Sequence, residues 1–177
     1  MKKYNTTYLC LLSLILISIT YACGLNNIET SEGDYIYNLE LIPRLGSTLD
    51  GYFVLKLDST KTQTIHRISG RLLKNGEEPY PPEKVEWDSN LTWALNDTTY
   101  IIYRSFLNLL GNWVVVDTSY ITGFDGEIVP TINESSYTGT DGEINTIIAP
   151  IYSMKGDTMI VRCRFKEFES KLYIILR

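Results

Sequence analysis

Short segments with strand-type alternation recur about every 10–15 residues along this 177-residue chain, and no segment repeats apolar residues with a helical period over three turns. β-Branched and aromatic residues dominate these segments, and glycine, proline, asparagine and aspartate separate them, as in strands joined by turns. The expected strands are 35–41, 52–57, 64–73, 84–87, 99–106, 113–120, 142–148, 158–165 and 172–176. The pattern predicts an all-β sandwich or barrel and excludes a parallel α/β sheet, which needs alternating helices.

The first two dozen residues have the layout of a secretory signal segment. Lys2 and Lys3 provide a basic start, residues 9–19 are apolar apart from two serines, and small residues follow. A run of about 11 apolar residues is too short to span a membrane, which takes about 20. We therefore predict export with removal of residues 1–22. The loss of the two lysines takes the formal charge from −5 to −7.

Residues 20–24, Thr-Tyr-Ala-Cys-Gly, resemble the lipobox of bacterial lipoprotein precursors. Ala22 and Cys23 match the family pattern, whereas Thr20 replaces the usual leucine and Tyr21 is bulky. The resemblance implies lipidation of Cys23 and anchoring to a membrane of the bacterial cell envelope, with the outer membrane or cell surface expected rather than the inner membrane. Several acyl chains make a stable anchor, at about 0.8 kcal/mol per buried CH₂. The alternative is ordinary cleavage after Ala22, which would release a soluble protein.

The remainder of the chain is predicted to be a polar tether at 23–33 followed by one domain at 34–177. The charge of the chain argues against nucleic acid as a partner, because 21 acidic residues outnumber 16 basic ones over all 177 residues and no basic cluster exists. An acidic body also repels anionic headgroups. Membrane contact is therefore expected through the lipid anchor alone.

Three cysteines and one histidine limit the chemistry available to the chain. Cys10 leaves with the signal segment, and lipidation of Cys23 leaves Cys163 without a disulfide partner. Alternation around Cys163 predicts a buried, apolar role. If Cys23 were not lipidated, a Cys23–Cys163 bridge would be possible. His66 is interpreted as one more strand position.

No catalytic motif is present in the sequence. A catalytic triad or a zinc site would have to be built around the single histidine, and there is no phosphate-binding loop, dinucleotide fingerprint or zinc-protease motif. A glycosidase would need only two suitably spaced carboxylates, and no pair among the many stands out. We predict a non-enzyme without a cofactor.

Residues 122–128 and 138–144 echo each other at an offset of 16 residues, each with an Asp-Gly-Glu-Ile core. One interpretation is a paired calcium site that uses the carboxylates of Asp125, Glu127, Asp141 and Glu143. The simpler interpretation is that each Asp-Gly makes a tight turn before a strand. On that interpretation there is no metal site.

The tryptophans are the best functional lead. Trp87 alternates with Val85, which predicts a core position. Trp93 and Trp113 either belong to the core or form a platform on which the apolar faces of sugar rings stack. Tyrosines that could extend such a platform are Tyr100, Tyr103, Tyr120 and Tyr137.

The segments 68–73, 75–80, 85–90, 138–144 and 156–161 resemble, in order and character, bacterial Ig-like domains of the invasin/intimin type. The resemblance covers a little over half the chain, and the aromatic segment 92–120 and the strands at 35–57 depart from it. It implies an Ig-like antiparallel β-sandwich with a structural or adhesive role and no catalysis.

Two functions are therefore expected from the sequence. The first is a lipid-anchored interaction module that contacts another envelope protein. The alternative is a carbohydrate-binding surface lipoprotein that holds a polysaccharide against Trp93 or Trp113.

Overall fold

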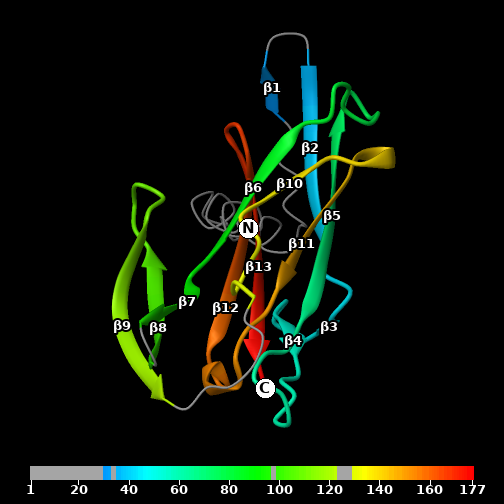
Figure 1. Cartoon of the computed structure of the whole chain (residues 1–177). Helices are drawn as coiled ribbons and strands as arrows, with labels where there is room; N and C mark the ends of the chain where they lie inside the picture. The colour runs from blue at the N-terminus through cyan, green and yellow to red at the C-terminus, as the bar shows by residue number, and fades with distance from the viewer. Residues whose placement is uncertain (1–29, 33–34, 97–98, 123–128) are drawn as a thin grey trace, which may run out of the picture.

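The computed structural model of the chain describes residues 30–32, 35–96, 99–122 and 129–177. These residues form three sheets and two short 3₁₀ turns, η1 (Thr140–Gly142) and η2 (Tyr152–Met154) (Figure 1). The all-β prediction is confirmed. The predicted signal segment 1–22 and Cys23 lie outside the described residues. Within the described part of the chain, no helix is long and apolar enough to cross a membrane.

Two sheets make up the body of the molecule. The first has the order β1 (Thr30–Glu32), β2 (Tyr35–Ile42), β5 (His66–Lys74), β11 (Glu143–Ile148). The second has the order β10 (Ser135–Tyr137), β6 (Lys84–Ser89), β12 (Thr158–Phe165), β13 (Phe168–Leu176), β4 (Phe53–Leu55), β3 (Gly46–Ser47). Neighbouring strands are antiparallel except β13 and β4, which are parallel. β1 falls within the predicted tether, so the last part of that segment is paired in a sheet.

The first and second sheets face each other across one hydrophobic core. Alternation selects the core side chains: along β12, Met159, Val161, Cys163 and Phe165 are buried on the inner face. Tyr37 of β2 reaches across to Phe165, with ring centroids 5.0 Å apart. The predicted burial of Trp87 and Cys163 is confirmed, since their side chains are 2% and 0% exposed.

Glycines permit two close approaches in the first sheet. A Cβ at Gly70, in the middle of β5, would lie 2.5 Å from the Glu40 carbonyl oxygen of β2. Gly142 has φ +70° and sits against the Leu72 carbonyl, where a side chain has no room. Asp141-Gly142 thus forms a tight turn before β11, as the simpler interpretation predicted. The first copy of the echo, with Asp125 and Glu127, lies outside the described residues.

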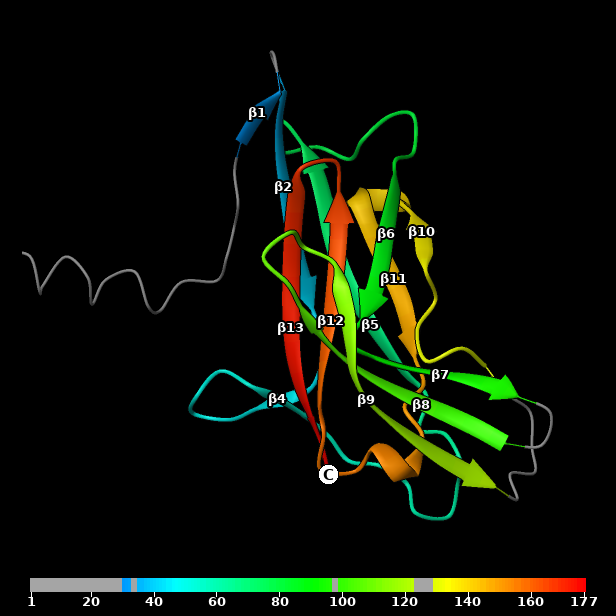
Figure 2. The same cartoon turned by 90° about the vertical axis from the view of Figure 1, so that its left-hand side faces the viewer.

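The third sheet is an insertion that leaves the body after β6 and returns before β10. It has the order β7 (Leu91–Asn96), β8 (Thr99–Leu107), β9 (Trp113–Thr122). Figure 2 shows it crossing obliquely over the outer face of the second sheet. Leu91 and Ile102 belong to the main core cluster, so the insertion is packed onto the body. The β8–β9 register shifts between Arg104 and Ser105 and leaves Val116 as an extra, bulged residue.

Candidate functional site

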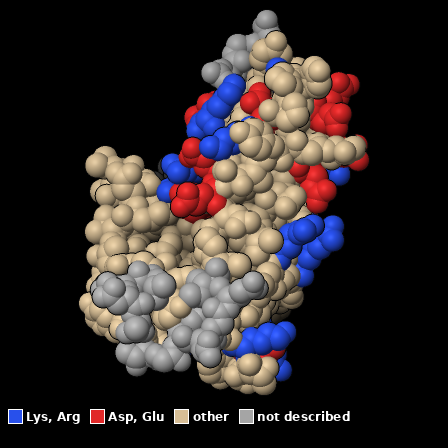
Figure 3. Space-filling model, viewed as in Figure 1, with Lys and Arg blue, Asp and Glu red and all other residues tan. Residues whose placement is uncertain are grey.

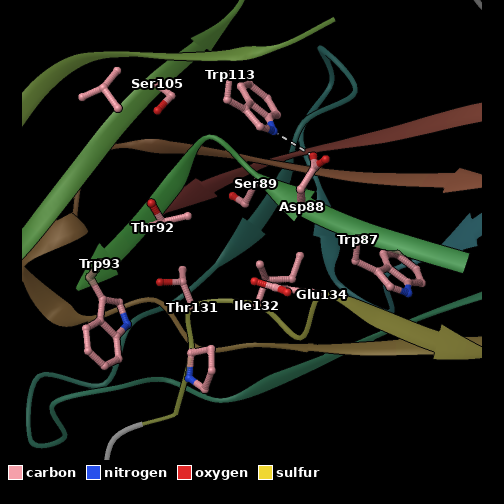
Figure 4. Close-up of a pocket in the computed structure, with 12 residues that line it drawn as sticks. Trp87, Asp88, Ser89, Thr92, Trp93, Ser105, Trp113, Thr131, Ile132 and Glu134 are labelled. Atoms are coloured by element: carbon pink, nitrogen blue, oxygen red, sulfur yellow. Dashed lines mark hydrogen bonds between the residues drawn. The ribbon is translucent and has the colours of Figure 1, made fainter. Parts of the chain in front are cut away.

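A pocket of about 400 Å³ lies between the insertion and the second sheet (Figure 4). Its walls come from β6, β7, β8, β9 and the segment 130–134 that leads into β10. All three tryptophans of the chain line it, together with the hydroxyl-bearing residues Ser89, Thr92, Ser105 and Thr131 and the acidic residues Asp88 and Glu134. Its volume lies in the range of small-molecule sites, roughly 300–1,000 Å³.

The three tryptophans contribute differently to this pocket. Trp87 is buried, and its indole N–H donates to the Ser136 hydroxyl at 2.9 Å. Trp93 is half-buried, and its ring meets the edge of Tyr100 at a centroid distance of 5.3 Å. Trp113 is half-buried and donates to Asp88 Oδ1 at 2.8 Å. The structure therefore brings the two candidate stacking residues, Trp93 and Trp113, into one site.

A buried ion pair of the second sheet, Arg162–Asp88, binds the β8–β9 end of the insertion. Arg162 of β12 is 3% exposed, and its Nε and Nη2 donate to Asp88 Oδ1 at 2.8 Å and Oδ2 at 2.7 Å. Its Nη1 donates to the carbonyl of Gly111, in the β8–β9 turn, at 2.8 Å. The Trp113 ring covers the guanidinium at 5.1 Å from the ring centroid, a cation–π contact. The hydrogen bonds to Asp88 raise the pKa of Arg162 above its ordinary value, so the charge is fixed.

Further polar contacts fix the orientation of the insertion. Arg104 of β8 donates through Nε to Asp157 Oδ2 at 2.9 Å and through Nη1 to the Ser119 hydroxyl at 2.8 Å. Asn90, between β6 and β7, accepts from the Ile160 N–H at 2.7 Å and donates to the Thr158 carbonyl at 3.0 Å. These bonds hold the insertion in one position on the second sheet, so the pocket between them is formed without a ligand.

Two deeply buried polar atoms at the pocket have no hydrogen-bond partner among the described residues. They are Trp93 Nε1 and Thr131 Oγ1, and the Thr131 residue as a whole is 3% exposed. In Figure 4 the Trp93 indole nitrogen lies on the side of the ring that faces Thr131. An unpaired buried polar group costs about 1–3 kcal/mol. A polar ligand that supplies hydrogen bonds here would recover part of that cost.

The two carboxylates of the pocket lie in different electrostatic settings. Both oxygens of Asp88 accept from Arg162, and Arg164 Nη2 lies 3.2 Å from Oδ2. Glu134 is exposed, and its side chain forms no ion pair with any described residue. Glu134 therefore gives the pocket its one uncompensated charge within the described part of the chain.

The other reactive residues lie away from the pocket. His66 begins β5, and its Nε2 lies 2.9 Å from the Pro43 carbonyl oxygen. Burial raises the pKa of the Cys163 thiol, and Asp88 adds to the shift. The described residues include no group of three or more His, Cys, Asp and Glu side chains that could hold a metal ion.

The sequence marks Trp93 and Trp113 as candidates by residue type, but it does not mark the polar residues that surround them in the pocket. Asp88, Ser105, Thr131 and Glu134 carry no motif, and only the docking of the insertion brings them together. The predicted tyrosine platform is not assembled at this pocket, because none of the four tyrosines is among the residues that line it. Comparison with protein-family models, with curated proteins and with solved structures finds no match to this chain.

Proposed function

We propose that this protein is a non-catalytic, lipid-anchored bacterial envelope protein that binds a saccharide in the tryptophan-lined pocket. The observation that carries the proposal is the convergence of two partly exposed tryptophans, Trp93 and Trp113, on one pocket, with the buried Trp87 in its wall. Indole rings offer flat apolar surfaces that suit the apolar faces of sugar rings. Trp93 Nε1 and Thr131 Oγ1 lack a hydrogen-bond partner among the described residues and expose almost no surface, so they would bond to sugar hydroxyls once the groups that cover them move aside.

The body that carries this pocket is proposed to be an Ig-like sandwich. In immunoglobulin-type sandwiches, strands A, B and E share one sheet, and strands C, F and G share the other. The strands β2, β5, β6, β11, β12 and β13 follow that assignment in chain order, and β10 extends the second sheet beside β6 in the manner of a C′ strand. Trp87 lies on β6, the C-like strand on which Ig domains carry a buried tryptophan. The insertion then occupies the connection that follows this strand.

Intrinsic fluorescence offers a direct test of saccharide binding. The chain has three tryptophans and all line the pocket, so the emission has no tryptophan contribution from elsewhere. Titration of the protein with soluble polysaccharides and their oligomers is expected to shift or quench this emission. Unchanged emission across neutral, amino and acidic glycans would contradict the proposal.

Two variants connect binding to the pocket. Trp93→Ala removes a stacking surface, and Thr131→Val removes an unpartnered hydroxyl while keeping the shape of the side chain. Both are expected to weaken binding, and Thr131→Val should do so without loss of stability. Tyr120→Ala is the matched control, because Tyr120 is a 68% exposed aromatic of the insertion that does not line the pocket. Equal binding by Trp93→Ala and Tyr120→Ala would place the ligand elsewhere.

A second candidate function, contact with another envelope protein, is supported by the exposed surface of the insertion. Its exposed apolar residues are Phe106, Leu109, Leu110, Val114, Val115, Val116 and Tyr120. In Figure 3 Lys, Arg, Asp and Glu gather beside the insertion, and the surface of its visible lobe is mostly uncharged. Exposed apolar patches of this kind mark interaction sites. A Leu109→Ser, Leu110→Ser double variant is expected to lose co-purification of a cross-linked envelope partner, and retention of the partner would count against this candidate.

A further inference from the structure

We propose that the tryptophan-lined pocket selects saccharides by charge: it admits neutral sugars, favours sugars with a protonated amine and rejects uronic acids. The inference rests on the saccharide binding proposed above and specifies which sugar class the pocket takes. It follows from how the charges around the pocket are paired.

The arginines near the pocket are each paired with carboxylates. No Lys, Arg or His is among the described residues that line it. Arg162 lies opposite Asp88 on the neighbouring strand, where it is buried, covered by the Trp113 ring and bonded to both oxygens of Asp88. Arg164 is held between Asp88 and Glu86, with Nη2 at 3.2 Å and 3.3 Å from their Oδ2 and Oε2 atoms. Among the described residues, a carboxylate or sulfate on a sugar would therefore meet no cation in the pocket wall, and the arginines nearby already have carboxylate partners.

Glu134 sets the sign of the field that a ligand meets. The Glu134 backbone carbonyl accepts a hydrogen bond from the backbone N–H of Trp87 at 2.8 Å, and this bond fixes the main chain beside the pocket. Its carboxylate lines the pocket and is paired with no cation of the described residues. A carboxylate accepts hydrogen bonds from hydroxyls and forms a charge-assisted bond with an amine. It repels a second carboxylate at the same distance, so discrimination arises from both attraction and repulsion.

The test is a fluorescence titration of the mature protein with three β-linked oligomers of equal length: one of glucosamine, one of glucose and one of a uronic acid. The titrations are run at about pH 6, where the amine is protonated and an ordinary carboxyl is ionised. The glucosamine oligomer is expected to bind tightest, the glucose oligomer more weakly and the uronate oligomer not measurably. Glu134→Gln is expected to reduce the preference for glucosamine over glucose about fivefold, the effect of one partly exposed ion pair.

Glu167→Gln is the control, because it makes the same change of net charge at an exposed residue that does not line the pocket. The inference is overturned if the uronate oligomer binds as well as the glucosamine oligomer, or if Glu134→Gln and Glu167→Gln have the same effect. Binding of all three oligomers without discrimination would overturn the charge selection and leave the proposed function standing. Absence of binding by all three would overturn both.

Discussion

Arg162 lies directly opposite Asp88 in the antiparallel pair of β12 and β6, and the two side chains share two hydrogen bonds of 2.8 and 2.7 Å. Both residues belong to the outer face of the second sheet, where a strand normally meets solvent. Arg162 is nevertheless 3% exposed, because the β8–β9 turn and Trp113 cover it. The ion pair is therefore both buried by the insertion and part of the surface that holds the insertion.

Replacing Asp88 with alanine is expected to lower the free energy of unfolding by about 3–5 kcal/mol, because it leaves the Arg162 guanidinium buried without its main counter-charge. Urea unfolding followed by circular dichroism measures this change. Glu86→Ala is the matched control on the same strand and face: its ion pair with Arg164 is partly exposed, and its loss should cost no more than about 1 kcal/mol. Equal losses in the two variants would show that the Arg162–Asp88 pair does not hold the insertion in place.

Trp87→Phe and Trp93→Phe are expected to differ in stability although both remove one indole N–H. The Trp87 N–H is bonded to Ser136, and its removal leaves the Ser136 hydroxyl unpaired. The Trp93 N–H has no partner among the described residues, and its removal takes away an unpaired buried donor. Thermal or urea unfolding should show Trp87→Phe to be less stable than Trp93→Phe by about 1 kcal/mol or more. The reverse order would mean that the Trp93 N–H is satisfied in solution.

The buried Cys163 thiol is expected to react slowly with a thiol reagent in the native protein at about pH 8 and rapidly after unfolding, because burial raises its pKa and the thiolate is the reactive form. Cys163→Ala should lose this slow reaction, and fast native labelling at Cys163 would contradict its burial. The raised pKa of Cys163 also makes the free energy of unfolding depend on pH. The thiol of the unfolded chain ionises at about pH 8.5, whereas the folded thiol is still protonated at that pH. The stability that depends on the neutral thiol is complete below that pH and decreases above it.

Cys23→Ala is expected to abolish metabolic labelling of the protein with palmitate and to release it from the membrane fraction. The control is Cys163→Ala, which removes a buried thiol and should keep the label. A label that persists in Cys23→Ala would place the lipid on another residue. Cys23 lies outside the described residues, so this experiment bears on the sequence prediction alone.

Most of the longer strands could be predicted from alternation, and the three-residue β4 also lies within an expected strand, 52–57. Residues 35–41, 99–106, 113–120 and 158–165 were expected as strands and lie within β2, β8, β9 and β12. β7 was missed because it follows β6 after the single residue Asn90, with no glycine or proline to signal a turn. β1, β3 and β10 have two or three residues each, too few for a period of two to be recognised.

The candidate site could be predicted only in part, because its assembly depends on tertiary docking. Aromatic type alone marked Trp93 and Trp113. Pairing of Asp88 with Arg162, 74 positions apart, depends on strand register, which the sequence does not reveal without the neighbouring strands. Thr131 and Glu134 enter the pocket through a segment between elements, where no periodicity applies.

The bulge at Val116 opposes edge-to-edge aggregation between copies of this protein that are crowded on one membrane. β9 is a ten-residue strand at the edge of its sheet, and three consecutive valines begin at its second residue. Such edges template the growth of fibrils between molecules. The extra residue at Val116 bends the strand, and the charged side chain of Asp117 follows immediately. Crowded copies thus meet an edge that is interrupted near its centre, which opposes aggregation where a lipid anchor would concentrate them.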